Sequence, residues 1–244
     1  MIWEELKSRK NFVEEDFIEL RDSVEEIIKI FEKYKDMRKN SKGYIEEMKR
    51  FLAHIVIEAK TPLKVGGGKN DLFYDAPIQR DFNGLPMILG TSVAGIIRRA
   101  FEEYVGEEAA NEIFGTKGRD SKNLVGSRLV VSNALLVNEN GMVCEELLPK
   151  KSKFLQLFDS LPIRDHVAIN ANGTTKDAGK FDEEVIFSGS RFKFSLELAG
   201  TKDEFEKILN LLSDPALRLG GGSSKGFGAL AINDIKWGEF DLYN

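Results

Sequence analysis

Two short segments of this chain alternate between apolar and polar residues, which is the period of a β-strand with one buried face. They are residues 51–60 and residues 191–198. Each is followed along the chain by an amphipathic helical pattern, between Val93 and Tyr104 in the first case and between Phe205 and Leu212 in the second. The chain therefore repeats the order of a strand followed by a helix.

The remaining segments complete the order of elements. Residues 124–137 are rich in strand formers, residues 138–190 are long, polar and weakly periodic, and a last strand runs from Ala229 to about Trp237. The order is β–α–β, a long excursion, and β–α–β, which predicts an α+β, ferredoxin-like (RRM-like) sheet with an insertion over about 138–190. The strands lack the aromatic signature of RNA-recognition modules, so any RNA would be contacted through loops.

Hydroxyl residues mark the expected starts of the two helices. Thr91 or Ser92 can cap the first helix, and Thr201 can cap the second, because their side-chain oxygens accept hydrogen bonds from the first free amides.

Residues 1–50 differ in composition from the rest of the chain. They contain no proline and one glycine, and charged residues are dense throughout. Apolar residues at helical spacing predict a long amphipathic helix over about 15–38 and a shorter one from about Gly43. We interpret residues 1–50 as a helical extension of a main domain over 51–244. The extension either packs on that domain or docks another subunit.

Composition excludes several classes of protein. Cys144 is the only cysteine and there are two histidines, which argues against disulfide frameworks and zinc sites built on Cys or clustered His. No apolar run approaches the roughly 18 residues of a membrane span, and the acidic N-terminus lacks the features of a signal peptide. We therefore expect a cytoplasmic protein. With a net charge of −5, any nucleic acid would be bound by a local patch.

A glycine-rich stretch, LGGGSSKGFG, occupies residues 219–228. Glycines let the backbone approach a ligand closely, and successive amides can bind an anion. The stretch is not a Walker A loop, because Gly-Phe follows Lys225, and too little chain remains after it for a dinucleotide-binding unit. A tight structural connection and a phosphate-binding loop both fit. A second glycine run, Gly66–Gly68, follows the first strand.

Three ordered motifs resemble the RAMP superfamily (repeat-associated mysterious proteins) of CRISPR effector complexes. The first is the glycine-rich stretch with the helix before it and the strand after it. Residues 74–101, YDAPIQRDFNGLPMILGTSVAGIIRRAF, are similar to the family's segment after the first strand. Residues 163–192, IRDHVAINANGTTKDAGKFDEEVIFSGSRF, are similar to the thumb of type III backbone subunits. The resemblance covers about 51–244.

The resemblance implies a subunit that binds a CRISPR guide RNA, meets target RNA, and assembles with other RAMP subunits and the large subunit of the complex. In cleaving members a loop aspartate cuts the target RNA with Mg²⁺ or another divalent metal, and Asp75 stands at that position. One alternative is a non-cleaving subunit that only holds guide RNA or caps the complex. A metal-independent guide-processing enzyme that uses histidine is the weakest fit.

The expected RNA contacts are backbone groups of the two glycine runs and nearby cations. They are Gly67, Gly68, Arg98, Arg99, Arg164, His166, Gly221, Gly222, Ser223, Ser224, Lys225 and Gly226. Each also has a plainer interpretation: a solvated side chain for the cations, a tight turn for the glycines, and a hydrogen-bonded structural side chain for His166 and for His54.

Several carboxylates have competing interpretations. Asp75 would hold the metal or act as a base, or would only start a turn before Ala76-Pro77. Asp71 and Asp81 are nearby alternatives, and we expect Asp81 to pair with Arg80. The acidic residues between 177 and 184 match no metal-binding template, and we expect a solvated run. They are Asp177, Asp182, Glu183 and Glu184.

Overall fold

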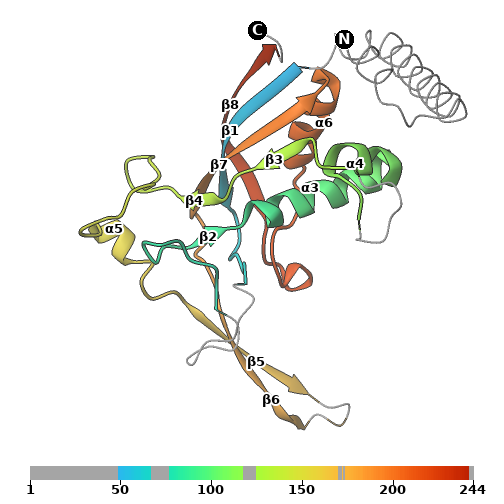
Figure 1. Ribbon diagram of the computed structural model, residues 1–244. Helices are drawn as coiled ribbons and strands as arrows, with labels where there is room; N and C mark the ends of the chain where they lie inside the picture. Colours follow the sequence, from blue (N-terminus) through green and yellow to red (C-terminus); the bar gives the residue numbers. More distant parts are fainter. Residues whose placement is uncertain (1–48, 67–76, 118–124, 170–171, 173, 242–244) are drawn as a thin grey trace, which may run out of the picture. The chain divides into compact units, whose positions relative to one another are not determined.

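The computed structural model describes residues 49–66, 77–117, 125–169, 172 and 174–241 (Figure 1). The chain divides into two compact units, Met1–Met48 and Lys49–Asn244, and every described residue belongs to the second. The helices predicted over 15–38 and from Gly43 lie outside the described residues.

The second unit is built on an antiparallel sheet. Its strand order is β2-β4-β7-β1-β8, with β3 also paired to β7. The long central strand β1 pairs with β7 on one side and with β8 on the other, as a ferredoxin-like sheet requires, so the predicted α+β fold class is confirmed. The strands are β1 Lys49–Ala59, β2 Met87–Ile88, β3 Leu129–Val131, β4 Ala134–Leu136, β7 Arg191–Gly200 and β8 Leu230–Asp241.

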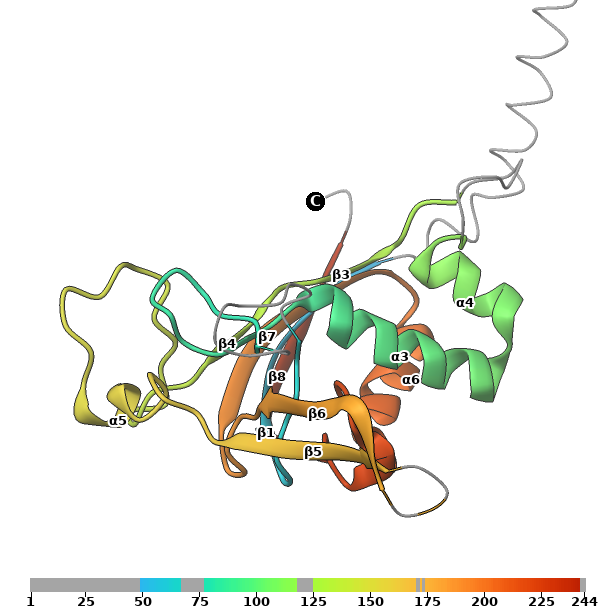
Figure 2. The same cartoon turned by 90° about the horizontal axis from the view of Figure 1, so that it is seen from below.

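Helices α3 and α6 lie on the same side of this sheet (Figures 1 and 2). The buried residues of β1 and β7 point toward them, and the Phe51 ring stacks on Phe205 of α6 with centroids 5.0 Å apart. Burying a side chain of this size contributes roughly 1.5–3 kcal/mol to stability. The helices are α3 Gly90–Val105, α4 Glu107–Phe114, α5 Lys153–Gln156 and α6 Lys202–Leu212. Among the described helices none is long and apolar enough to cross a membrane.

The two helix starts differ in how they are capped. Thr201 caps α6 as predicted, and Glu204 completes a capping box by accepting from the Thr201 amide. The prediction that Thr91 or Ser92 caps α3 is wrong. The N-cap residue is Leu89, and its side chain makes no capping hydrogen bond. Instead Asn133 Oδ1 accepts a hydrogen bond from the Gly90 amide at 3.0 Å. A partner 43 residues away in sequence replaces the local cap.

The long excursion contains α5 and a separate two-stranded sheet. Strands β5 (Ile163–Ile169) and β6 (Thr175–Glu184) pair in antiparallel fashion and form a sheet of their own beside the main one (Figure 1). We call them the β5–β6 hairpin. Its base is joined to the segment after β1 by the bridge between Leu63 and Ile186, with hydrogen bonds of 2.8 and 3.1 Å in the two directions. The hairpin is therefore held at its base.

Candidate nucleic-acid interface

The glycine-rich loop, residues 219–228, is a closed and ordered turn. Its ends pair through the amide of Leu219 and the carbonyl of Gly228, 2.9 Å apart. Between them Gly222 and Gly226 adopt left-handed conformations (φ 75° and 86°) on either side of a 3₁₀ turn at Ser223–Lys225. Left-handed backbone is what glycine supplies at little cost. Residues 223–226 are exposed at the tip of this turn.

The loop packs its backbone against the segment that follows β1. The amide of Gly221 donates to Lys64 O at 2.9 Å, and that of Gly228 donates to Pro62 O at 3.0 Å. At Gly220 (φ 81°) a Cβ would lie 1.9 Å from Lys64 O, so no other residue fits there. At Gly226 a Cβ would meet nothing within 4 Å. The glycines thus divide into those where a Cβ would clash with backbone, as at Gly220, and those at the tip with open space, as at Gly226.

A groove of about 340 Å³ separates the glycine-rich loop from helix α3. We call it the α3–loop groove. Its polar lining includes Arg99 and Glu103 of α3, and Arg218, Gly220 and Ser223 from the loop side. The structure therefore brings Arg99 beside the glycine-rich loop. Sequence reasoning missed Arg218, although its place directly before Leu219 and the glycines was a usable signal.

Arg98 and Arg99 have different surroundings. The Arg99 side chain is 83% exposed and pairs with Glu103 at 3.2 Å, an i,i+4 pair that contributes little in water. The Arg98 side chain is 17% exposed and donates to Glu102 at 2.8 Å and to Asn111 of α4 at 2.5 Å. The hydrogen bonds from Arg98 and then Lys117 hold the pKa of Glu102 below its ordinary value. Arg98 ties α3 to α4 and does not line the α3–loop groove.

The loop that carries Asp75 begins close to this groove. Asp75, Asp71, Gly67 and Gly68 lie outside the described residues, but both flanks of the segment 67–76 are described. Gly66 and Ile78 form a bridge, and the Gln79 amide donates to Val65 O at 2.9 Å. The two flanks of the segment are therefore held together, and the first of them includes Lys64, whose carbonyl accepts the hydrogen bond from Gly221.

Two hairpin residues predicted to contact RNA lie on β5. Arg164 is exposed and in register with Glu183, and the backbone of His166 is in register with Phe181.

The other histidine, His54, lies on the face of the main sheet away from the helices, where its Nδ1 is 2.9 Å from Ser195 Oγ. Among the described residues, His, Cys, Asp and Glu form no cluster of three or more that could hold a metal ion. The metal role of Asp75 stays a prediction.

The prediction of a solvated acidic run is wrong for its last two members. Side chains of Glu183 and Glu184 are only 7% and 6% exposed. Glu183 pairs with Lys64, and Glu184 pairs with Arg80 at 2.5 Å. Burying a carboxylate is costly unless a cation and hydrogen bonds compensate its lost hydration, and both side chains have such a cation. These two acids are part of the structure at the hairpin base.

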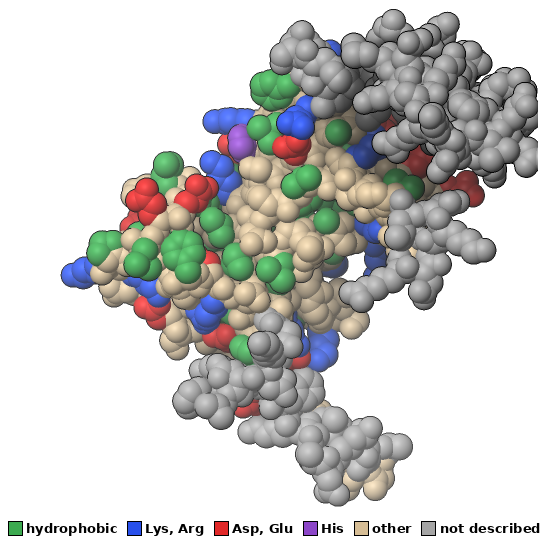
Figure 3. Space-filling model, viewed as in Figure 1, with side chains coloured by type: hydrophobic (Ala, Val, Ile, Leu, Met, Phe, Trp, Pro, Cys, Tyr) green, Lys and Arg blue, Asp and Glu red, His purple; other side chains and the backbone are tan. Residues whose placement is uncertain are grey.

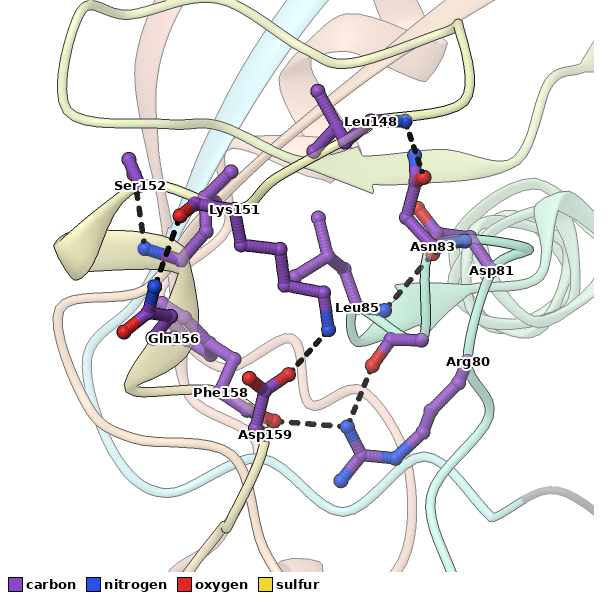
Figure 4. Close-up of polar contacts among 12 residues, drawn as sticks. Arg80, Asp81, Asn83, Leu85, Leu148, Lys151, Ser152, Gln156, Phe158 and Asp159 are labelled. Atoms are coloured by element: carbon purple, nitrogen blue, oxygen red, sulfur yellow. Dashed lines mark hydrogen bonds and ion pairs between the residues drawn. The ribbon is translucent and has the colours of Figure 1, made fainter.

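The expected pair between Arg80 and Asp81 is also absent. Asp81 Oδ1 accepts hydrogen bonds from the amides of Asn83 and Leu85, at 2.8 and 2.9 Å, and so closes its own turn (Figure 4). Arg80 points the other way and donates to the carbonyls of Gly84 and Phe158 (Figure 4). Two adjacent residues of opposite charge thus serve different neighbours.

Lysine, arginine and acidic side chains are interspersed on the face drawn in Figure 3, with no single basic surface. This distribution agrees with the net charge of −5. A polyanion would have to be held in a confined place such as the α3–loop groove, where Arg99 and Arg218 meet exposed backbone.

A family model and a solved structure are each similar to this chain. The model of the RAMP superfamily matches residues 56–231. A chain in the cryo-EM structure of the type III-B Cmr-beta bound to cognate target RNA is similar in fold, with a TM-score of 0.55 and 20% sequence identity. The match covers 87% of this chain and 66% of that chain. A comparison with curated proteins gave no match.

Proposed function

This chain belongs to the RAMP superfamily, and from that membership we propose that it is a guide-RNA-binding subunit of a type III CRISPR effector complex. The observation that carries the proposal is the α3–loop groove, which places Arg99 and Arg218 beside an exposed glycine-rich turn. The fold likeness to a chain of a type III-B complex bound to target RNA supports the same class of assembly. Its partners are guide RNA, target RNA, other RAMP subunits and the large subunit, in the cytoplasm.

The α3–loop groove suits a ligand recognised by its backbone. Within the described parts of the chain the amides of Ser223 and Ser224 make no hydrogen bond, and both residues are exposed. Such amides can donate to phosphate oxygens or to the oxygen of a 2′-hydroxyl, while Arg99, Arg218 and Lys225 supply positive charge. None of these contacts reads a base. That property fits a subunit that must hold guides of many sequences.

The β5–β6 hairpin has a separate role in the proposal. It is a two-stranded element joined to the main sheet mainly at its base, and Arg164 is exposed on it. We assign it to the thumb, which separates the guide–target duplex at intervals. Separated nucleotides lose stacking and become available to side chains from loops.

In addition to binding guide RNA, the chain is proposed to cleave the target RNA. Asp75 would act as a base toward the 2′-hydroxyl or hold Mg²⁺ near the scissile phosphate. A bound divalent metal would supply stabilisation of charge on the phosphate oxygens. The flanks of the segment 67–76 are joined by the bridge between Gly66 and Ile78, and Lys64, two residues before Gly66, accepts a hydrogen bond from Gly221 of the glycine-rich loop.

The decisive experiment compares wild type and Asp75→Asn in the reconstituted complex with labelled target RNA and Mg²⁺. We expect equal guide content and target affinity, and loss of cleavage in the variant. Cleavage at the wild-type rate would assign this chain to the alternative, a scaffold that holds guide RNA without cutting. A complex that assembles with the chain but carries no guide RNA would remove the RNA-binding proposal itself.

A further inference from the structure

The turn before β2 presents an aromatic side chain to solvent. Phe82 is 62% exposed, although phenylalanine is among the residues most often buried. Hydrogen bonds fix the turn around it. Asp81 Oδ1 accepts from the amides of Asn83 and Leu85 (Figure 4), and the Asn83 side chain donates to Glu146 O at 3.0 Å. The backbone therefore holds Phe82 at the surface without help from its ring.

Phe82 lines a cleft of about 500 Å³ beside β2 and β4. We call it the Phe82 cleft. Two half-buried residues that are in register, Met87 of β2 and Leu135 of β4, extend its apolar lining. A cleft of this volume lies within the range of small-molecule sites. Its polar lining includes Asp81, Asn133 and Glu145.

The polar groups of the Phe82 cleft include both acceptors and donors. Asp81 uses Oδ1 for its own turn, while its Oδ2 makes no hydrogen bond to any described residue. Glu145 is exposed and pairs with no cation in the described part of the chain. Asn133 Oδ1 accepts from the Gly90 amide at 3.0 Å, and this bond leaves the two N–H donors of the side-chain amide without a described partner. The cleft thus offers two carboxylates and one amide donor group.

This combination disfavours a phosphate and favours a planar base. The two carboxylates repel an anion, and Arg80, which also lines the cleft, already pairs with Glu184. A purely apolar group would leave the carboxylates and the amide unpaired on burial, which is costly. A nucleobase stacks on an aromatic ring with its face and carries donors and acceptors on its edge. It can therefore satisfy both kinds of polar group at once.

The Phe82 cleft and the α3–loop groove are built against the same helix. Asn133 of the cleft holds the Gly90 amide at the start of α3, and Arg99 of the groove lies further along that helix. At 1.5 Å per residue, Gly90 and Arg99 are about 13 Å apart along the helix axis. This spacing is small enough for one RNA strand to reach both places.

We propose that the Phe82 cleft binds one unstacked RNA base, with a preference for bases that carry an exocyclic amino group. This inference rests on the proposed function, which brings RNA to α3. The ring of Phe82 stacks on the base, the amino group donates to Asp81 or Glu145, and Asn133 donates to an acceptor on the base. Adenine, cytosine and guanine carry such an amino group and uracil does not. Three of the four bases qualify, so guides of many sequences remain acceptable.

The test uses the full chain with ¹³C-labelled methionine methyl groups, and adenosine, cytidine and uridine as probes. The chain has five methionines. Met87 lines the cleft, and Met142 is the internal control because it is 63% exposed and lies outside the cleft. Adenosine and cytidine should shift the Met87 signal in a saturable way and leave the Met142 signal in place. Uridine should bind about 10-fold more weakly, because it lacks the amino group that donates to a carboxylate.

Two variants with matched controls assign the contacts. Phe82→Ala should weaken adenosine binding about 10-fold, the size of effect expected when a base loses its aromatic platform. Leu147→Ala is its control, because Leu147 is 74% exposed and lies outside the cleft. Glu145→Gln should reduce the preference for adenosine over uridine about 5-fold, because it removes the charge of one acceptor. Glu146→Gln, at the exposed neighbour outside the cleft, should keep the preference.

The inference is wrong if no nucleoside shifts the Met87 signal at millimolar concentration, or if all three bind equally in wild type and in Phe82→Ala. If Phe82→Ala disturbs the remaining methionine signals, Phe82→Leu decides. That variant keeps an apolar side chain without a ring, so an unchanged adenosine affinity in it contradicts stacking. If the nucleosides leave Met87 unmoved while Phe82→Ala weakens capture of a neighbouring subunit, the cleft docks protein and the inference is again wrong.

The proposed function fails in a different way. A reconstituted complex that contains this chain but no guide RNA contradicts the proposed function, even where adenosine shifts Met87 in the separate chain. A complex that retains guide RNA, together with a chain that binds no nucleoside, contradicts only the Phe82 cleft.

Discussion

The backbone carbonyl of Lys64 accepts a hydrogen bond from the amide of Gly221 at 2.9 Å. The side chain of the same lysine pairs with Glu183 at the hairpin base. One residue therefore touches the glycine-rich loop with its backbone and the β5–β6 hairpin with its ammonium. The glycine-rich loop and the β5–β6 hairpin both contact Lys64, which itself lies in the N-terminal flank of the segment 67–76. A substitution of Lys64 should therefore perturb the packing of all three.

Gly220→Ala should destabilise the chain strongly. Its Cβ would lie 1.9 Å from Lys64 O at a φ of 81°. A left-handed conformation costs a non-glycine residue roughly 1–2 kcal/mol, and forced overpacking costs about 1–3 kcal/mol more. Urea unfolding should show the combined loss. Gly226→Ala is the control: it has the same sign of φ but open space, so about 1–2 kcal/mol is expected. Equal losses in the two variants would contradict the packing role of Gly220.

The main sheet could be predicted from the sequence because its determinants are local. Alternation over 51–60 and 191–198 corresponds to β1 and β7, and the strand expected from Ala229 corresponds to β8. Because one face of each strand is buried, apolar and polar residues alternate along it, and this alternation can be read directly from the sequence. The capping of α6 was equally local, since Thr201 and Glu204 are three residues apart.

The ion pairs of the hairpin base could not be predicted in this way. Glu184 lies 104 residues from Arg80, and nothing in the acidic stretch distinguishes it from the other acids around it. Arg98 and Arg99 illustrate the same limit on a smaller scale. Adjacent residues on a helix point about 100° apart, so one arginine meets α4 and the other meets the groove. Polar partners are set by the tertiary fold.

Removing charge from the α3–loop groove, or from Lys225 at the exposed tip of the glycine-rich loop, should reduce the salt dependence of RNA binding. The purified subunit should bind single-stranded RNA weakly, because its net charge is −5. For each phosphate that a variant no longer neutralises, the slope of log K against log salt should become shallower by about 0.7. Arg99→Gln, Arg218→Gln and Lys225→Gln are expected to show this change, measured by fluorescence anisotropy at several salt concentrations.

Arg98→Gln is the matched control for that series. It removes the same charge one residue away, but Arg98 binds Glu102 and Asn111, so the slope should stay unchanged while stability falls. If Arg98→Gln lowers the slope as much as Arg99→Gln does, the effect is one of net charge and the groove is not the binding site.

Deleting residues 1–45 should leave a folded domain. The described hydrophobic core is made of residues between Phe51 and Leu219 with the partly buried residues around it, and β1 begins at Lys49. We expect the shortened chain to unfold cooperatively in a thermal melt and to assemble less well with a neighbouring subunit in a pull-down. An insoluble product would show that residues 1–45 are part of the core.

The Arg128–Glu204 pair should make stability depend on pH in the acidic range. Burial raises the pKa of Glu204, but hydrogen bonds from Arg128 and from the Thr201 backbone outweigh it, so the net pKa lies below its ordinary value of 4.5. A carboxyl whose pKa is lower in the folded state stabilises that state above its unfolded pKa. This stabilisation is lost as pH falls from about 4.5 through the folded pKa.

The measurement is the difference in free energy of unfolding between wild type and Glu204→Gln at a series of pH values. We expect a difference of about 1–2 kcal/mol near neutral pH, the size of one hydrogen bond to a charged group in a partly exposed place. The difference should stay constant down to about pH 5 and shrink below it, because protonated Glu204 resembles glutamine in charge. Glu206→Gln, an exposed neighbour on α6, should change stability little at any pH. A difference for Glu204→Gln that stays unchanged as the pH falls below 4.5 through the folded-state pKa would mean that the variant acts through packing and that the charge of the pair contributes nothing.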